Sequence, residues 1–374
     1  MGKEDSNVAV LSLTSFAIDI TFSSWWMILP LYLERLGASV TEVGLCYALI
    51  GLAWALSQLP GGVFSDRFGR KRVILISTLT FTPFYTSMLF LKEWASVTIA
   101  VTLSSFFAGL QNPSFSSMIA ESSRRFGLAR AFGFYNFLMN LGWAVGPLIG
   151  AFAIPSLGFD PIFVIGAIVT TVCLLIRAVL LSEPPASSER VRTSLKMLFL
   201  PITLSILIFQ LANGLISPLI PLYAEKLMGF GVSEIQLMFF AAQLLASLSS
   251  LIAGLFVARI GGLKSLIVSF IFSGVFSLTW VFSSSYAAFI VLSLYYTFLF
   301  AFTEVAFSTL LSELTARESR ATVFGVSTVI SGLSHSAGSY IGGVVWEALH
   351  PVVPFLLAFT LMLAAPLPLL KKRF

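Results

Sequence analysis

Residues 61–72 read Gly61-Gly-Val-Phe-Ser-Asp66-Arg-Phe-Gly-Arg70-Lys-Arg72 and hold one acid and four bases in a chain that is otherwise almost uncharged. An apolar segment that begins near Val43 precedes this stretch, and another follows it from Val73. Each apolar segment has about the 20 residues that an α-helix needs to cross a bilayer. The charged stretch is therefore predicted to be a short loop between two membrane-spanning helices.

The composition extends this reading to the whole chain. Of its 374 residues, 57% are hydrophobic and only 10% are charged, whereas soluble domains carry about 25% charged residues. We therefore expect an all-α polytopic membrane protein whose first helix is retained. Breaks in hydrophobicity predict twelve spans, at residues 8–33, 43–64, 73–91, 96–120, 131–154, 161–181, 198–223, 235–257, 265–282, 286–311, 321–345 and 351–370.

The positions of the basic residues predict the orientation. If both termini are cytoplasmic, eighteen of the 22 lysines and arginines lie on the inner side and three lie in outer loops, as the positive-inside rule requires. The remaining base, Arg177, lies inside the sixth span and is expected to reach the cytoplasmic surface by snorkelling. The net charge of +5 then reflects topology and attraction to lipid rather than nucleic-acid binding. We expect a multi-pass protein of the inner or plasma membrane.

The two halves of the chain repeat each other at an offset of 192 residues. The matched pairs are Gly62 and Gly254, Arg67 and Arg259, Gly69 and Gly261, Glu121 and Glu313, Gly146 and Gly338, and Gly150 and Gly342. Because each half holds six spans, both halves enter the membrane from the same side. The predicted domains are a six-helix bundle at 1–182, a polar cytoplasmic linker at 183–197 and a second six-helix bundle at 198–374, in a chain expected to be a monomer.

The charged loop resembles a signature of the major facilitator superfamily, and the resemblance covers essentially the whole chain. The matching residues are Gly62, Asp66, Arg67, Gly69, Arg70 and Lys71. The resemblance implies a transporter with two pseudo-symmetric bundles, in which Asp66 meets the start of the eleventh span and Arg70 pairs with Glu121. We expect these residues to form a latch on the cytoplasmic side. In the second copy the motif has decayed, since Ala258 replaces the acid and Gly262 and Leu263 replace two bases.

A second motif lies in the fifth span and resembles one found mainly in proton-coupled exporters of the superfamily. Its residues are Gly142, Gly146, Pro147 and Gly150. Ordinary close packing of helices through glycine is the alternative explanation. Asp19 followed by Leu29-Pro30 is also similar to the first helix of many drug exporters. One departure is that residues 103–109 of the fourth span hold no arginine, so the arginine linked to proton coupling in many members has no counterpart there.

Two acids are predicted near the middle of the membrane. Helical rise places Asp19 about 16 Å and Glu304 about 13 Å inside the bilayer, where an ionisable group costs about 3 kcal/mol or more and marks a functional candidate. Asn112 is the repeat partner of Glu304, which predicts one central site shared by the two halves. Structural, hydrogen-bonded acids are the alternative. The other predicted cavity residues are Ser23, Trp26, Gln210, Asn213, Tyr296 and His335, of which His335 is equally explained as a packed residue.

These residues predict a secondary transporter. Burial favours the neutral form of a carboxyl group, so a proton and a cationic substrate would compete for Asp19 and Glu304. We expect a proton-coupled antiporter that exports hydrophobic or cationic small molecules by rocking of its halves. The alternatives are a carrier of a neutral metabolite or lipid-like molecule and a non-transporting receptor or scaffold. Two histidines 15 residues apart, isolated Cys46 and Cys173, and no phosphate-binding loop predict no enzyme activity, no metal and no cofactor.

Overall fold

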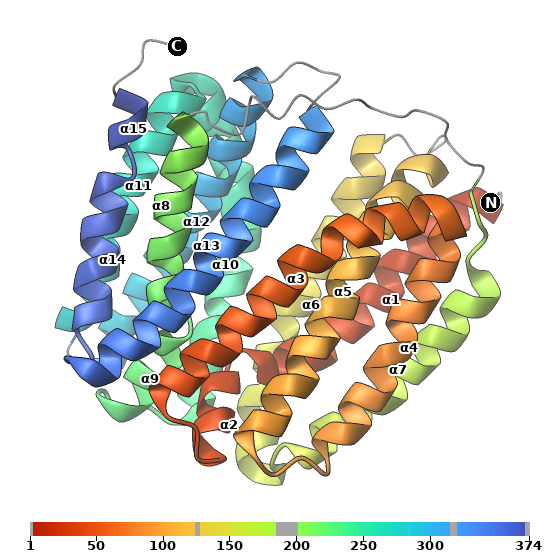
Figure 1. The fold of residues 1–374 in the computed structure, drawn as a ribbon, viewed down its shortest axis with the longest axis horizontal. Helices are drawn as coiled ribbons and strands as arrows, with labels where there is room; N and C mark the ends of the chain where they lie inside the picture. The colour runs from red at the N-terminus through yellow and green to blue at the C-terminus, as the bar shows by residue number, and fades with distance from the viewer. Residues whose placement is uncertain (1–2, 124–127, 185–200, 284, 315–319, 371–374) are drawn as a thin grey trace. The chain divides into compact units, whose positions relative to one another are not determined.

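The computed structural model describes residues 3–123, 128–184, 201–283, 285–314 and 320–370, and in these ranges the chain is helical with no strand (Figure 1). The predicted linker residues 185–197 lie outside the described residues. The helices are α1 (Lys3–Trp26), α2 (Leu29–Arg35), α3 (Val40–Phe68), α4 (Arg70–Met88), α5 (Trp94–Ser122), α6 (Leu128–Leu157), α7 (Asp160–Leu180), α8 (Pro201–Ile216), α9 (Leu219–Lys226), α10 (Val232–Ile260), α11 (Gly262–Thr279), η2 (Trp280–Phe282), α12 (Tyr286–Leu314), α13 (Arg320–Ala348), α14 (Val353–Ala364) and α15 (Leu367–Leu370).

Each predicted span coincides with one of these helices or with two consecutive ones. The first, seventh and twelfth spans are interrupted, and a proline lies in or directly after each break: Pro30 in the first turn of α2, Pro218 and Pro366. A proline lacks the backbone N–H that continues a helix and clashes with the preceding turn, so it favours a break. Within the described ranges, nine helical segments have both the length and the hydropathy of membrane spans. The all-α, twelve-helix prediction is confirmed.

The chain forms two compact units. Unit 1 contains Met1–Gly37, Ala53–Ser188 and Gly231–Phe240, and unit 2 contains the remaining segments, Ala38–Leu52, Glu189–Phe230 and Ala241–Phe374. Unit 1 therefore includes the first turns of α10, and unit 2 includes the first half of α3. The predicted domain boundaries at 182 and 198 follow the sequence repeat and stay a prediction.

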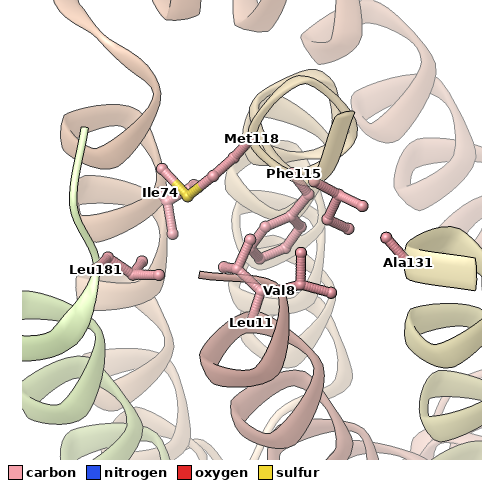
Figure 2. Packing of buried hydrophobic residues seen from close by; sticks show 8 residues of the cluster. Val8, Leu11, Ile74, Phe115, Met118, Ala131 and Leu181 are labelled. Atoms are coloured by element: carbon pink, nitrogen blue, oxygen red, sulfur yellow. The ribbon is translucent and has the colours of Figure 1, made fainter. Parts of the chain in front are cut away.

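Inside unit 1, α1 packs along α6 and α7, and α4 packs along α5 and α7 (Figure 1). A buried apolar cluster joins the ends of these helices, and Figure 2 shows how its side chains converge. Because lipid tails are as apolar as these side chains, close packing rather than escape from water holds such helices together in a membrane. The cluster consists of Val8, Leu11, Ile74, Phe115, Met118, Ile119, Ala131 and Leu181.

Glycines provide the closest helix contacts, and they do so at repeat-related positions. A Cβ added at Gly146 of α6 would lie 2.6 Å from the carbonyl oxygen of Ile20 on α1, and one at Gly150 would collide with the carbonyl oxygen of Ser24. In unit 2, Gly338 and Gly342 of α13 are equally close to backbone carbonyls of α8. The repeat seen in the sequence therefore corresponds to the same pair of helices in both units.

The charged loop is shorter than predicted, because α3 continues to Phe68 and α4 begins at Arg70, which leaves Gly69 alone between the two helices. The charged loop and its decayed copy share one backbone conformation at this glycine. Gly69 precedes α4 with φ 95° and ψ 151°, and Gly261 precedes α11 with φ 88° and ψ 150°. Only glycine adopts such angles without strain. The 192-residue offset thus preserves a backbone geometry as well as residue types.

In unit 2, the carboxyl group of Glu347 binds the first turn of α3. Glu347 lies two residues beyond the predicted eleventh span, and it accepts a hydrogen bond of 2.6 Å from the backbone N–H of Val40 and another from the hydroxyl of Thr41. Partial burial opposes ionisation of this carboxyl group, but the hydrogen bonds from Thr41 and Val40 outweigh it and hold the Glu347 pKa below its ordinary value. The N-terminus of α3, which carries partial positive charge, also favours an anion there.

Replacing Glu347 by glutamine is expected to lower the melting temperature by about 2 °C above pH 5, because a capping carboxylate contributes about 1 kcal/mol. A depressed pKa means that this contribution is complete above the ordinary value of 4.5 and is lost as the pH falls through the lower value of the folded protein. Thermal unfolding in detergent at pH 3 to 7 checks this. The matched control is Glu93→Gln, since Glu93 precedes α5 without a side-chain capping bond. If the difference in melting temperature between Glu347→Gln and the parent protein grew on acidification, Glu347 would not be the cap of α3.

Candidate functional site

Asp19 lies half-exposed on α1, against the glycine motif of α6. A Cβ added at Gly142 would lie 2.9 Å from Cβ of Asp19, and the neighbouring Trp143 directs its indole N–H to the Asp19 carboxyl group as a hydrogen-bond donor. One turn along α1, the hydroxyl of Ser23 donates to the carbonyl oxygen of Gly142 at 3.1 Å. The structure therefore brings together Asp19, Ser23 and the α6 motif, which the sequence analysis treated separately.

Aromatic rings extend from Asp19 along α1. Phe22 stacks on Trp26 with centroids 4.8 Å apart, and it also meets Trp143 edge-on at 6.0 Å. Trp26 and Trp143 are both half-exposed. A carboxylate beside several aromatic faces is suited to a hydrophobic cation. Phe22 was missed by the sequence analysis because one phenylalanine among 36 carries no signal.

Three polar pairs form the corresponding region of unit 2. Gln210 of α8 donates a hydrogen bond of 3.3 Å to Glu304 of α12, and the hydroxyl of Tyr296 donates to the Asn213 side-chain oxygen at 2.5 Å. Ser217 lies 3.1 Å from the Nε2 atom of His335, which is on α13. All five predicted residues of this half, Glu304, Gln210, Asn213, Tyr296 and His335, thus belong to pairs that join α8, or the turn directly after it, to α12 or α13.

Asn112 lies half-exposed on α5, in unit 1. Within the described ranges its side chain makes no hydrogen bond, and its carbonyl oxygen accepts one from Ser116. Its repeat partner Glu304 belongs to unit 2. The predicted candidates are therefore divided between the two units, and a site shared by both stays a prediction.

The snorkelling predicted for Arg177 is wrong. Arg177 is only 1% exposed, and its guanidinium group donates to the hydroxyls of Thr14, Ser15 and Thr78 at 2.7 to 3.0 Å. The group also lies over the ring of Phe115, 5.0 Å from its centroid. Hydroxyl groups on α1 and α4 thus retain the charge inside unit 1, where the sequence analysis expected no base.

The charged loop is organised around Arg70, which is only 8% exposed. Its guanidinium group contacts Asp66 at 2.9 Å and Glu121 at 3.1 Å. The resemblance implied the second of these pairs. The Asp66 side chain is 75% exposed. The space beside Gly62 is open, since nothing lies within 4 Å of a Cβ placed there. The guanidinium group of Arg67 stacks on the ring of the neighbouring Phe68, 5.5 Å from its centroid.

Glu183 completes this loop and was missed as a functional residue, because the sequence analysis assigned it to the linker. Its two carboxyl oxygens accept hydrogen bonds from the backbone N–H groups of Arg70 and Lys71, at 2.5 and 2.9 Å. A carboxylate is stabilised at a helix N-terminus, here that of α4, by the partial positive charge of the free N–H groups. The end of α7 is thereby fixed to the loop.

No group of three or more histidine, cysteine or acidic residues suited to a metal ion occurs in the part of the chain that the structure describes.

Comparison with known proteins decides the family. The family model of the Major Facilitator Superfamily matches residues 11–200 and 202–373. The chain belongs to the major facilitator superfamily. It is a multi-pass membrane transporter of that family, and the likeness stated from the charged loop is confirmed.

Relatives of the chain include drug-resistance proteins. The chain is 21% identical to the quinolone resistance protein NorA of Staphylococcus aureus over 371 residues, which cover 96% of this chain and 95% of NorA. It is 30% identical to a homolog of the multi-drug resistance efflux pump PmrA of Lactococcus lactis over 145 residues, and 30% identical to an uncharacterized MFS-type transporter of Methanocaldococcus jannaschii over 154 residues. Those two matches cover 38% and 40% of this chain, but only 36% and 39% of the relatives.

Solved structures of other major facilitator proteins have the same fold. The nucleoside transporter NupG matches with a TM-score of 0.81 and 14% identity, covering 96% of this chain and 98% of NupG. A D-xylose–proton symporter matches with a TM-score of 0.79 and 14% identity, covering 98% of each chain. At this identity the likeness concerns the fold and not the substrate.

Proposed function

We propose that the chain is a proton-coupled antiporter that exports hydrophobic or cationic small molecules. The observation that carries the proposal is a carboxyl group midway along a membrane helix in each unit, each with one neutral hydrogen-bond donor. For Asp19 the donor is Trp143, and for Glu304 it is Gln210. Neither acid has an ion-pair partner within 4 Å in the described part of the chain, so each is available for a proton or a cation. The full-length likeness to NorA supports the same function.

The expected transport chemistry follows from the side chains around Asp19 in unit 1. An ionised Asp19 attracts a cation, and the faces of Trp26 and Trp143 add attraction for a flat, hydrophobic one. Protonation removes the charge and with it much of the attraction, so proton binding releases the substrate. Since the proton and substrate exclude each other, alternating access converts an inward proton gradient into outward transport. We expect no cofactor and no enzymatic reaction.

The expected setting is the plasma membrane, with both termini cytoplasmic and the chain a monomer. Small-molecule substrates, protons and the lipid bilayer are then its partners. The clustering of basic residues in the predicted inner segments supports this orientation.

Proteoliposomes test the function. Purified protein is reconstituted with ethidium as the probe cation and a pH-sensitive dye in the lumen. An imposed proton gradient is expected to drive ethidium uphill, and an ethidium gradient is expected to drive protons in the opposite direction. Ethidium affinity should fall on acidification. Transport of a neutral sugar or nucleoside at a rate independent of pH, with no ethidium flux, would instead establish the neutral carrier.

The loop around Arg70 is proposed to act as the cytoplasmic latch. Asp66→Asn is expected to favour the inward-facing state, because a neutral side chain no longer complements the start of the eleventh span. A cysteine at Ser116, which is exposed on α5 between Asn112 and Glu121, reports accessibility from the cytoplasmic side. Its labelling by a maleimide should rise several-fold in Asp66→Asn.

Native Cys46 and Cys173 are buried and give a low labelling background. Asp66→Glu, which keeps the charge, is the control and should label like the parent protein. Equal labelling of Asp66→Asn and the parent would refute the latch.

A further inference from the structure

Arg177 is a buried cation that the proposed transport cycle does not yet use. Its hydrogen-bond acceptors are all neutral hydroxyls: Oγ1 of Thr14 at 2.8 Å, Oγ1 of Thr78 at 2.7 Å and Oγ of Ser15 at 3.0 Å. No carboxylate lies within 4 Å of it among the residues that the structure describes. A buried charge without a counter-ion is strongly unfavourable. Its position therefore calls for an explanation beyond packing.

The acid that interacts with this cation is Asp19. Asp19 and the Arg177 guanidinium group interact electrostatically, and the hydroxyl of Ser15 that binds Arg177 lies four residues before Asp19 on α1. Residues four apart occupy the same face of a helix, about 6 Å apart at Cβ. The guanidinium group is thus anchored one turn from the acid, on the helix that carries it.

The other titratable groups near Asp19 are neutral at physiological pH. They are Tyr85 of α4, Tyr135 of α6 and Cys173 of α7, and each interacts with Asp19 or Arg177. From α5, which also packs on α1, no titratable side chain interacts with Asp19 in the described residues. Among these groups, Arg177 is therefore the one whose charge interacts with Asp19.

We propose that Arg177 is a positioning residue for proton exchange at Asp19: its fixed charge, anchored on α1 by Thr14 and Ser15, stabilises the ionised carboxylate and sets the pH range over which Asp19 releases its proton. The role rests on the proposed proton coupling. With the cation in place, Asp19 ionises at a lower pH than an isolated acid in the same apolar surroundings. Because the cation is held by hydroxyls and not by Asp19 itself, the carboxylate remains free to bind substrate.

The test measures protonation of Asp19 directly. Dicyclohexylcarbodiimide reacts with protonated carboxyl groups inside membranes, and mass spectrometry quantifies the labelled Asp19 peptide at pH 5 to 9. Arg177→Gln removes the charge but keeps hydrogen-bonding groups. The midpoint of Asp19 labelling is expected to move up by about one pH unit, and the pH profile of ethidium-driven proton flux should move with it. Arg177→Lys, which retains the charge, should restore the wild-type midpoint.

Two further variants separate this role from a structural one. Ser15→Ala leaves Arg177 bound to Thr14 and Thr78 but removes its bond to the turn that carries Asp19, so a smaller shift in the same direction is expected even if Arg177→Gln does not fold. Asp19→Asn combined with Arg177→Gln should show the same flux profile as Asp19→Asn alone. An unchanged labelling midpoint in folded Arg177→Gln or Ser15→Ala overturns the proposal. Absence of proton flux in the wild type, with the labelling shift intact, overturns the antiporter function instead.

Discussion

Replacing Asp19 by asparagine is expected to reduce proton-driven ethidium transport by about two orders of magnitude while the protein remains folded. The amide has nearly the shape of the carboxyl group and keeps its contact with Trp143, but it neither ionises nor carries a proton. Ethidium affinity should then lose its dependence on pH. The measurement is flux in proteoliposomes together with equilibrium binding at pH 6 and pH 8.

Asp160→Asn is the matched control, since it removes the same charge from the exposed first turn of α7 and should transport normally. Glu304→Gln is expected to behave like Asp19→Asn, because Gln210 can hydrogen-bond an amide but no proton can be exchanged. Normal proton-driven transport in both single variants would refute the assignment of the two acids.

Gly146→Ala is expected to destabilise the protein by about 3 kcal/mol or more, since overpacking usually costs 1–3 kcal/mol and here the obstacle is largely backbone. The new methyl group would collide with the hydroxyl of Ser23 and lie 2.6 Å from the carbonyl oxygen of Ile20. The serine can rotate away, but the carbonyl cannot move without separating α1 from α6. Thermal unfolding and the yield of monodisperse protein in detergent measure the effect.

Gly133→Ala is the control on the same helix, because nothing lies within 4 Å of a Cβ at that position. It should be neutral or raise stability by up to about 1 kcal/mol, since alanine favours helix more than glycine does. Gly338→Ala, at the repeat-related position of α13, should be as damaging as Gly146→Ala. If Gly146→Ala and Gly133→Ala had the same melting temperature, the close approach of α1 and α6 would be disproved.

The sequence predicted the helices well, because a membrane span is set by a local property, the hydropathy of about 20 consecutive residues. It also predicted the repeat, since a single offset can be read without any structure. The glycine motif of α6 was recognised, but its partner helix was not: spacing shows which residues share a face, and it does not show what that face contacts. The contact of Gly142 with Asp19 is therefore a result of the structure.

Arg177 shows where the prediction failed. In a helix as apolar as α7, no polar stripe tells which side faces protein, so a single base near the end was assigned to the membrane surface. The hydroxyls that bind it come from α1 and α4, more than 90 residues away in sequence. Glu183 and Glu347 were missed for a related reason, because a carboxylate that caps a distant helix has no local signal.

The paired conformation of Gly69 and Gly261 bears on how the chain arose. The first copy of the loop keeps an acid and four bases, whereas the second keeps few of them, yet both retain a glycine with φ near 90° and ψ near 150°. We infer that the two halves arose by gene duplication and that the charged side chains of the second copy were then lost. The sharp turn between two helices could not diverge, because every other amino acid is strained there. The backbone of the second loop thus retains the turn of the motif, although most of the charged residues of the motif are absent from it.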